Sequence, residues 1–164
     1  MTKTLVLGLG NPLLSDDSVG LRVAAELRVR LAGRPEVEVG EDYWGGLRLM
    51  ERLIGYQRAI IVDAIRAGAP PGTIHRLKPD DLPTQRSASA HDVNLPTALE
   101  LGRRAGVPLP ENGQILLVAI EVEDILTFGE HCTPAVQAAI IPAVENVIEA
   151  LDAPPCTNWP SSRP

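Results

Sequence analysis

The stretch TLVLGLGNPLLSDDSVG, residues 4–20, decides the fold of this chain. Its beginning, Thr4–Leu9, is mostly apolar and favours β structure, which predicts a buried strand. After the acidic pair Asp16 and Asp17, apolar residues recur at every fourth position, which predicts a helix. These residues are Val19, Val23, Leu27 and Leu31. Because open α/β sheets bind ligands at the carboxyl ends of their strands, we expect Asp16 or Asp17 to contact the ligand.

The acidic pair also has a local structural explanation. Ser15 can cap the following helix, and carboxylates in a first helical turn interact favourably with the helix dipole. That explanation accounts for one acid more easily than for two.

Strands alternate with helices along the rest of the chain. Further strands are predicted at Val37–Gly40, Ala59–Ala64, Thr73–Leu77 and Gln114–Ile120. Further helices are predicted at Leu47–Ile54, from Asn94 to Gly106 and from Thr133 to Leu151. Pro142 lies inside the last pattern and predicts a kink or a break there. This alternation predicts an α/β fold with a mostly parallel twisted sheet of about five strands and helices on both faces.

Length and composition limit the class of protein. We expect a single domain over residues 1–152 and a disordered proline-rich tail over residues 153–164. A formal net charge of −6 and an aromatic content of 3% argue against a nucleic-acid partner. The two cysteines, Cys132 and Cys156, lack the spacing of a disulfide framework or a zinc site. No basic leader and no apolar run of about 18 residues are present, so we expect a cytoplasmic protein that does not bind membranes.

Three residues are candidates for a shared metal site. Asp63 ends the most apolar strand, where an unpartnered buried carboxylate would be costly, and His91 ends an irregular loop that begins at Lys78. The ends of the first and third strands share one edge of a parallel sheet, and a later loop can reach it. Two carboxylates, one of them Asp16 or Asp17, and one imidazole suit a divalent transition ion with open coordination positions. Alternatively, Asp63 caps the next loop and His91 is a solvated loop residue.

Other chemistry has weaker support. The motif Gly8-Leu9-Gly10-Asn11-Pro12-Leu13 lacks the third glycine of a dinucleotide fingerprint, so both glycines are expected to serve only the turn. No G-x-S-x-G elbow is present, which argues against a serine hydrolase. The acidic group Glu121, Glu123 and Asp124, with His131, can be a second metal site, but a solvated strand end explains it more simply.

Four motifs together resemble the hydrogenase maturation endopeptidases. They are GLGNPLLSDDSVG at 8–20, IIVDA at 60–64, SAHDVNLPTALELG at 89–102, and LVAIEVE at 117–123 with TPAV at 133–136. The resemblance implies a peptidase that removes a C-terminal extension from the large-subunit precursor of a nickel-iron hydrogenase once nickel is in place. It also implies that Asp17, Asp63 and His91 contact nickel, which the precursor supplies, and carry the cleavage. Asp16 is then mainly a helix-start residue, and the protein is expected to be a monomer.

The chain departs from the family pattern at two places. Aspartate stands at the first acid position, where the family often has glutamate, and the segment Asp42-Tyr43-Trp44-Gly45 replaces a form rich in glycine and threonine. We expect the turn from Asp42 to Gly46 and the loop from Leu82 to Ala90 to set substrate choice, with Tyr43 and Trp44 as contacts. Alternatively, Trp44 packs onto the second helix and only supports the fold.

Two other functions stay open. Peptidyl-tRNA hydrolases share the opening GLGNP, but their asparagine-histidine signature is replaced here by the acidic pair. A non-catalytic nickel carrier or checkpoint protein can use the same three residues, and only detection of a shortened product excludes it.

Overall fold

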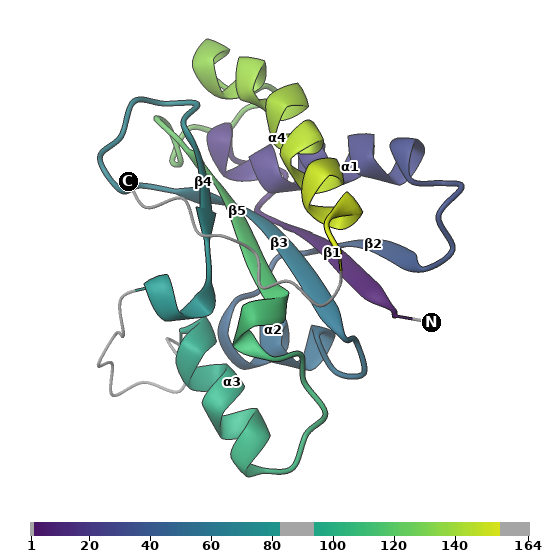
Figure 1. The fold of residues 1–164 in the computed structure, drawn as a ribbon. Helices are drawn as coiled ribbons and strands as arrows, with labels where there is room; N and C mark the ends of the chain where they lie inside the picture. Colours follow the sequence, from purple (N-terminus) through teal and green to yellow (C-terminus); the bar gives the residue numbers. More distant parts are fainter. Residues whose placement is uncertain (1, 83–93, 155–164) are drawn as a thin grey trace.

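In the residues described by the computed structural model, 2–82 and 94–154, five strands form one sheet (Figure 1). The strands are β1 (Thr4–Leu9), β2 (Val37–Asp42), β3 (Arg58–Ile65), β4 (Ile74–Leu77) and β5 (Ile115–Glu121). Their order across the sheet is β2-β1-β3-β5-β4, and only β4 runs antiparallel to its neighbour. The predicted α/β fold with a mostly parallel sheet is confirmed, and β3 is its central strand.

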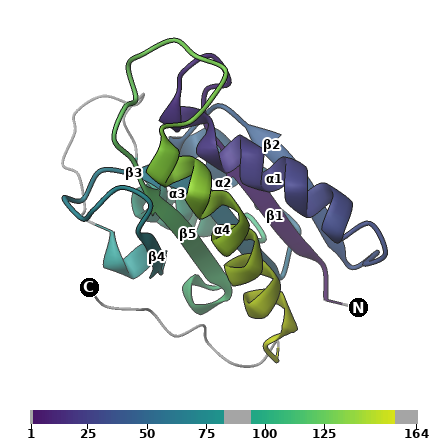
Figure 2. The same cartoon turned by 90° about the horizontal axis from the view of Figure 1, so that it is seen from above.

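Helices cover both faces of this sheet, as predicted. They are α1 (Val19–Arg30), α2 (Gly46–Arg52), α3 (Leu95–Arg104) and α4 (Pro134–Asp152). One face carries α1 and α4 and the other carries α2 and α3 (Figures 1 and 2). The short 3-10 helix η1 (Asp16–Ser18) precedes α1.

The continuous apolar runs of the inner strands follow from these two layers. In β3, Ile60 and Val62 pack in the core under α1 and α4, whereas Ala59 and Ile61 pack in the core under α2 and α3. Successive side chains of a strand point to opposite faces, so a strand covered on both sides has no polar position. This is why β3 shows no alternation of apolar and polar residues before Asp63.

Two glycines let α1 approach the sheet closely. A Cβ on Gly8 would collide with the carbonyl oxygen of Gly20, and a Cβ on Gly20 would collide with the carbonyl oxygens of Leu9 and Val62. Gly8 therefore lies inside β1 and serves helix packing, so the expectation that it only serves the turn is wrong. The close approach places η1 over the ends of β1 and β3.

The last helix, α4, is unbroken. Thr133 occupies its N-cap position and Pro134 its first turn, as predicted, but the helix continues through Pro142 to Asp152. The expected break is wrong because Pro142 is exposed, while the buried face of the helix keeps its packing on both sides of the proline. By length and hydropathy alone α4 could cross a membrane, but one face of it is part of the core. Nearly all of the expected tail lies outside the described residues.

Candidate active site

A pocket of about 320 Å³ opens where β1 and β3 end, at the carboxyl edge of the sheet. Its walls come from the segment after β1, the turn after β2 and the end of β3. It is lined by Leu9, Gly10, Asn11, Asp17, Tyr43, Trp44, Gly45 and Asp63. The structure thus brings two of the three sequence-predicted site residues, Asp17 and Asp63, into one pocket.

Asp17 lies in η1 and reaches this pocket from the side of β1. One oxygen of its carboxylate, Oδ2, accepts a hydrogen bond of 3.1 Å from the backbone N–H of Asn11. The bond closes the segment between β1 and η1 and orients the carboxylate. The side chain remains partly exposed and lines the pocket.

Asp63 lies on β3 and has a strongly altered acidity. Burial raises the pKa of Asp63 to about 7. The N–H of Ala64 donates to Oδ1 of Asp63 at 2.8 Å and opposes this rise in pKa, whereas the negative charge of Asp17 adds to the rise. A carboxyl group that titrates near neutral pH beside a second carboxylate is typical of functional sites. Asp63 does not cap the next loop, because Glu121 accepts the hydrogen bonds from Ala67 and Gly68 there.

His91, the third predicted residue, lies outside the described residues, as does most of the loop that was expected to flank the site. Within 2–82 and 94–154, no group of three or more acidic, histidine or cysteine side chains could hold a metal ion. The chain enters the intervening segment at Leu82 and leaves it at Asn94. The shared ligand set of Asp17, Asp63 and His91 therefore stays a prediction.

An apolar pocket of about 240 Å³ adjoins the first one. The two pockets share Leu9, Gly45 and Asp63. The second is lined otherwise mainly by aliphatic side chains, among them Leu49, Ile61, Leu77, Leu82, Leu95 and Leu117. An apolar cavity therefore lies beside the carboxyl group of Asp63.

Tyr43 and Trp44 form the outer wall of the acidic pocket. Their exposed fractions are 60% and 57%. The guanidinium of Arg48, on α2, lies over the Trp44 ring at 5.1 Å from its centroid. Trp44 therefore contacts the second helix through one cationic side chain, and most of its ring surface remains available to a partner.

Asp16 has a role that the sequence did not indicate. It is completely buried, and its carboxylate accepts hydrogen bonds from the N–H groups of Glu123 (3.0 Å), Asp124 (2.9 Å) and Thr133 (2.7 Å). Burial by itself raises the pKa of Asp16, but these bonds and the Thr133 hydroxyl outweigh it and hold the pKa below its ordinary value. Asp16 is the first residue of η1, as predicted for a helix-start residue, and it also fastens the segment between β5 and α4 to η1.

The expected helix caps are partly confirmed. Asn94 caps α3, since its side chain accepts from the N–H of Thr97 at 3.1 Å. Ser15 does not cap its helix; its hydroxyl donates instead to the carbonyl oxygen of His131 at 2.8 Å. The η1 region is therefore held by distant chain segments.

The acidic group at the end of β5 is not a metal site within the described part of the chain. Glu123 and His131 are exposed, as expected for a solvated strand end. Glu121 is buried, and its Oε2 lies 3.2 Å from Nε2 of His75, so the description of Glu121 as a surface residue is wrong. Its carboxylate supports the connection between β3 and β4.

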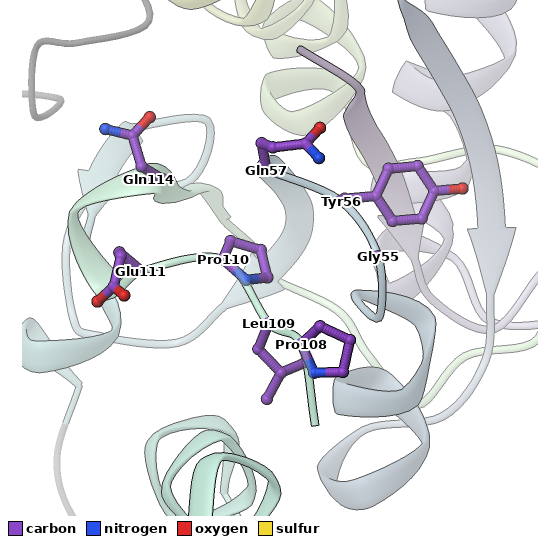
Figure 3. A pocket seen from close by; sticks show the side chains of 8 residues that line it. All are labelled: Gly55, Tyr56, Gln57, Pro108, Leu109, Pro110, Glu111 and Gln114. Carbon is purple, nitrogen blue, oxygen red and sulfur yellow. The ribbon is translucent and has the colours of Figure 1, made fainter. Parts of the chain in front are cut away.

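Another pocket, of about 380 Å³, lies at the amino ends of β3 and β5 (Figure 3). It is lined by Gly55, Tyr56, Gln57, Pro108, Leu109, Pro110, Glu111 and Gln114. The pocket carries a single carboxylate, Glu111, and the Tyr56 hydroxyl donates to Glu38 at 2.6 Å. Burial and that bond raise the pKa of Tyr56 to about 12, which makes it a poor general base. The acidic pocket at the other edge is therefore the better candidate for catalysis.

Known proteins that resemble this chain share its fold and belong to one family of proteases. A family model described as hydrogenase maturation protease matches residues 21–150. The hydrogenase 2 maturation protease of Escherichia coli (strain K12) is 32% identical over 152 residues, which cover 91% of this chain and 90% of the relative. The hydrogenase expression/formation protein HupD of Thiocapsa roseopersicina is 28% identical over 150 residues, covering 90% of this chain and 66% of the relative. The structure of the E. coli hydrogenase maturating endopeptidase HybD superimposes with a TM-score of 0.73 at 30% identity over 92% of each chain.

Proposed function

Because this chain belongs to the hydrogenase maturation protease family, we propose that it is an endopeptidase that removes the C-terminal extension of a nickel-iron hydrogenase large-subunit precursor after nickel insertion. The observation that carries the proposal is the pairing of Asp17 and Asp63 in one pocket at the carboxyl edge of the sheet. Carboxylate oxygens are ligands for divalent cations, and the pocket has room for a peptide backbone beside them.

In this proposal nickel is part of the substrate. The precursor presents the ion to Asp17 and Asp63, with His91 as the third contact. A divalent ion beside the scissile bond would polarise its carbonyl group. Water attacks the carbonyl carbon and loses a proton to a carboxylate, and that proton passes to the amine that leaves when the C–N bond breaks. Asp17 or Asp63 accepts the proton that the attacking water loses, because both carboxylates line the pocket. Asp17, held by the N–H of Asn11, orients the ion.

The decisive test uses the same precursor with and without nickel. The nickel-loaded precursor is expected to lose a C-terminal peptide on incubation with the protein, and the metal-free precursor is expected to stay uncut, because the ion supplies part of the recognition. Mass spectrometry of both products identifies the cut. A shortened product excludes a non-catalytic nickel carrier, whereas nickel-loaded precursor that binds and stays intact would favour one. Equal cleavage of the metal-free precursor would refute the nickel-dependent step.

The Tyr43→Ala/Trp44→Ala double variant is expected to lose precursor recognition without losing stability. Both rings are more than half exposed, and truncation of an aromatic anchor commonly costs ~2 kcal/mol of binding. The KM for the precursor should therefore rise about 30-fold while the melting temperature stays unchanged. Arg48→Ala is the control, since it removes the cation over Trp44 and keeps the ring. A lowered melting temperature with a normal KM would assign Trp44 to fold support instead.

We also propose that the protein acts in the cytoplasm as a monomer and binds neither membranes nor nucleic acid. The net charge of −6 supports the last point, because phosphate backbones require basic surfaces. The same charge balance disfavours a peptidyl-tRNA hydrolase.

A further inference from the structure

Large apolar side chains are exposed on two neighbouring segments beside the acidic pocket. Leu13 follows β1 and is 63% exposed, while Leu126 and Phe128 follow β5 and are 79% and 78% exposed. The two segments lie side by side (Figure 2): residues Leu14 and Phe128 form an antiparallel bridge, and the N–H of Gly129 donates to the carbonyl of Leu13 at 3.2 Å. Single exposed apolar residues are ordinary, but three on paired segments at one edge call for an explanation.

The backbone beneath these side chains is held by many hydrogen bonds. Asp16 accepts from Glu123 and Asp124, and the Ser15 N–H donates to the carbonyl of Thr127 at 2.9 Å. The carboxylate of Asp124 also accepts from the N–H groups of Leu126 (3.0 Å) and Thr127 (2.9 Å). The segment is therefore ordered while its apolar side chains remain in water. Such preorganised apolar groups bind a partner at a low cost in conformational entropy.

This surface lies near the acidic pocket, because the N–H of Leu13 donates to the side chain of Asn11 at 3.0 Å and Asn11 lines the pocket. Asn11 and Gly10 line the pocket, and Leu13 follows them in the same connection. The anchor of the second segment, Asp16, is adjacent in sequence to Asp17, whose carboxylate lies in the pocket. An occupant of the apolar surface would therefore lie close to the pocket, to which the proposed reaction brings the precursor.

We infer that Leu13, Leu126 and Phe128 form a docking surface for the folded body of the hydrogenase large-subunit precursor, separate from the pocket that receives its C-terminal segment. The inference rests on the proposed function and adds a second contact to it. Glu123 and Glu130, which flank Leu126 and Phe128 in the sequence, are exposed, so the matching face of the precursor is apolar with basic side chains at its edge. Docking there fixes the precursor while its extension enters the pocket.

The Leu126→Ser/Phe128→Ser double variant tests this surface. Neither side chain is packed in the core, so the melting temperature should not change. The KM for the nickel-loaded precursor should rise about tenfold or more, with kcat within about twofold, because docking contributes to binding and not to the chemical step. The matched control is Val29→Ser/Ile141→Ser, which changes side chains that are 76% and 51% exposed on the outer sides of α1 and α4. This control should keep the KM of the native protein.

The outcomes separate the two proposals. If the native protein cleaves the precursor and the double variant keeps its KM, or loses only kcat, the docking surface is refuted and the proposed function stands. If the native protein does not cleave any nickel-loaded precursor, the proposed function fails and the docking surface fails with it. Sedimentation of both proteins tests the other occupant: a dimer of the native chain that dissociates in the double variant would assign the surface to a second copy and overturn the inference.

Discussion

Replacing Asp63 by asparagine is expected to abolish precursor cleavage and, at the same time, to stabilise the metal-free protein above neutral pH. Cleavage is lost because asparagine can neither accept the proton from water nor supply a negative charge to the metal ion. Stability rises because asparagine stays neutral, whereas Asp63 becomes a poorly solvated carboxylate in the folded chain. Gains in stability on loss of a functional group are common at active sites.

The pH dependence of this effect follows from the direction of the shift. The pKa of Asp63 is about 7 in the folded protein, above the value of about 3.9 expected in the unfolded chain. Between these two pH values the folded state binds one proton more than the unfolded state, so the contribution of Asp63 to stability is lost as the pH rises toward 7. The variant lacks this loss. Its advantage in the free energy of unfolding should be smallest near pH 4 and reach about 4 kcal/mol near pH 8.

Urea denaturation at several pH values, with cleavage measured in parallel, checks both parts of this prediction. The matched control is Asp80→Asn, because Asp80 is exposed and its interaction with Asn112 survives in the amide. The control should cleave normally and show the pH profile of the native protein. Cleavage at the native rate by Asp63→Asn would remove Asp63 from the mechanism, and a pH-independent stability difference would contradict the raised pKa.

Replacing Asp16 by alanine is expected to lower the free energy of unfolding by about 3–5 kcal/mol. The substitution leaves the N–H groups of Glu123, Asp124 and Thr133 without their buried acceptor. Hydrogen bonds to a charged group contribute about 1.5–3 kcal/mol each, and these act together as one anchor. Because the pKa of Asp16 is lowered on folding, its contribution is present at neutral pH and disappears as the pH falls through that lowered value.

The neighbouring residue provides the control for this experiment. Asp17→Ala removes one partly buried hydrogen bond, which the N–H of Asn11 donates, so the melting temperature of the variant should stay near that of the native protein while cleavage is lost. Asp16→Asn keeps part of the acceptor set and should fall between Asp16→Ala and the native protein in stability. For cleavage by the folded fraction, Asp16→Asn should be milder than Asp17→Asn. The opposite ranking would exchange the roles of the two acids.

Local patterns in the sequence were sufficient for the fold. The continuous apolar run of β3 reflects a strand that is buried on both sides. The spacing of four residues between Val19 and Val23 reflects a helix that is buried on one side. Such patterns arise within a few residues of chain, so they can be detected without knowing what packs against them. The alternation of strands and helices then leaves few topologies for a parallel sheet. The motifs indicated the family because each of them is a contiguous stretch of sequence that can be recognised without knowing the tertiary structure.

Other features depend on residues far apart in the sequence. Asp16 and Asp17 are equivalent in sequence, and what separates them is a set of N–H donors more than 100 positions away, such as that of Glu123 at a separation of 107. Glu121 differs from Glu123 in the same way, because His75 and the loop after β3 surround only the former. Burial of a carboxylate is favourable only where such donors converge. The sequence by itself determined the fold, the family and the importance of the acidic pair Asp16 and Asp17. Only the tertiary structure decided that Asp16 anchors the chain and Asp17 faces the pocket, because their roles depend on hydrogen-bond donors that folding alone brings together.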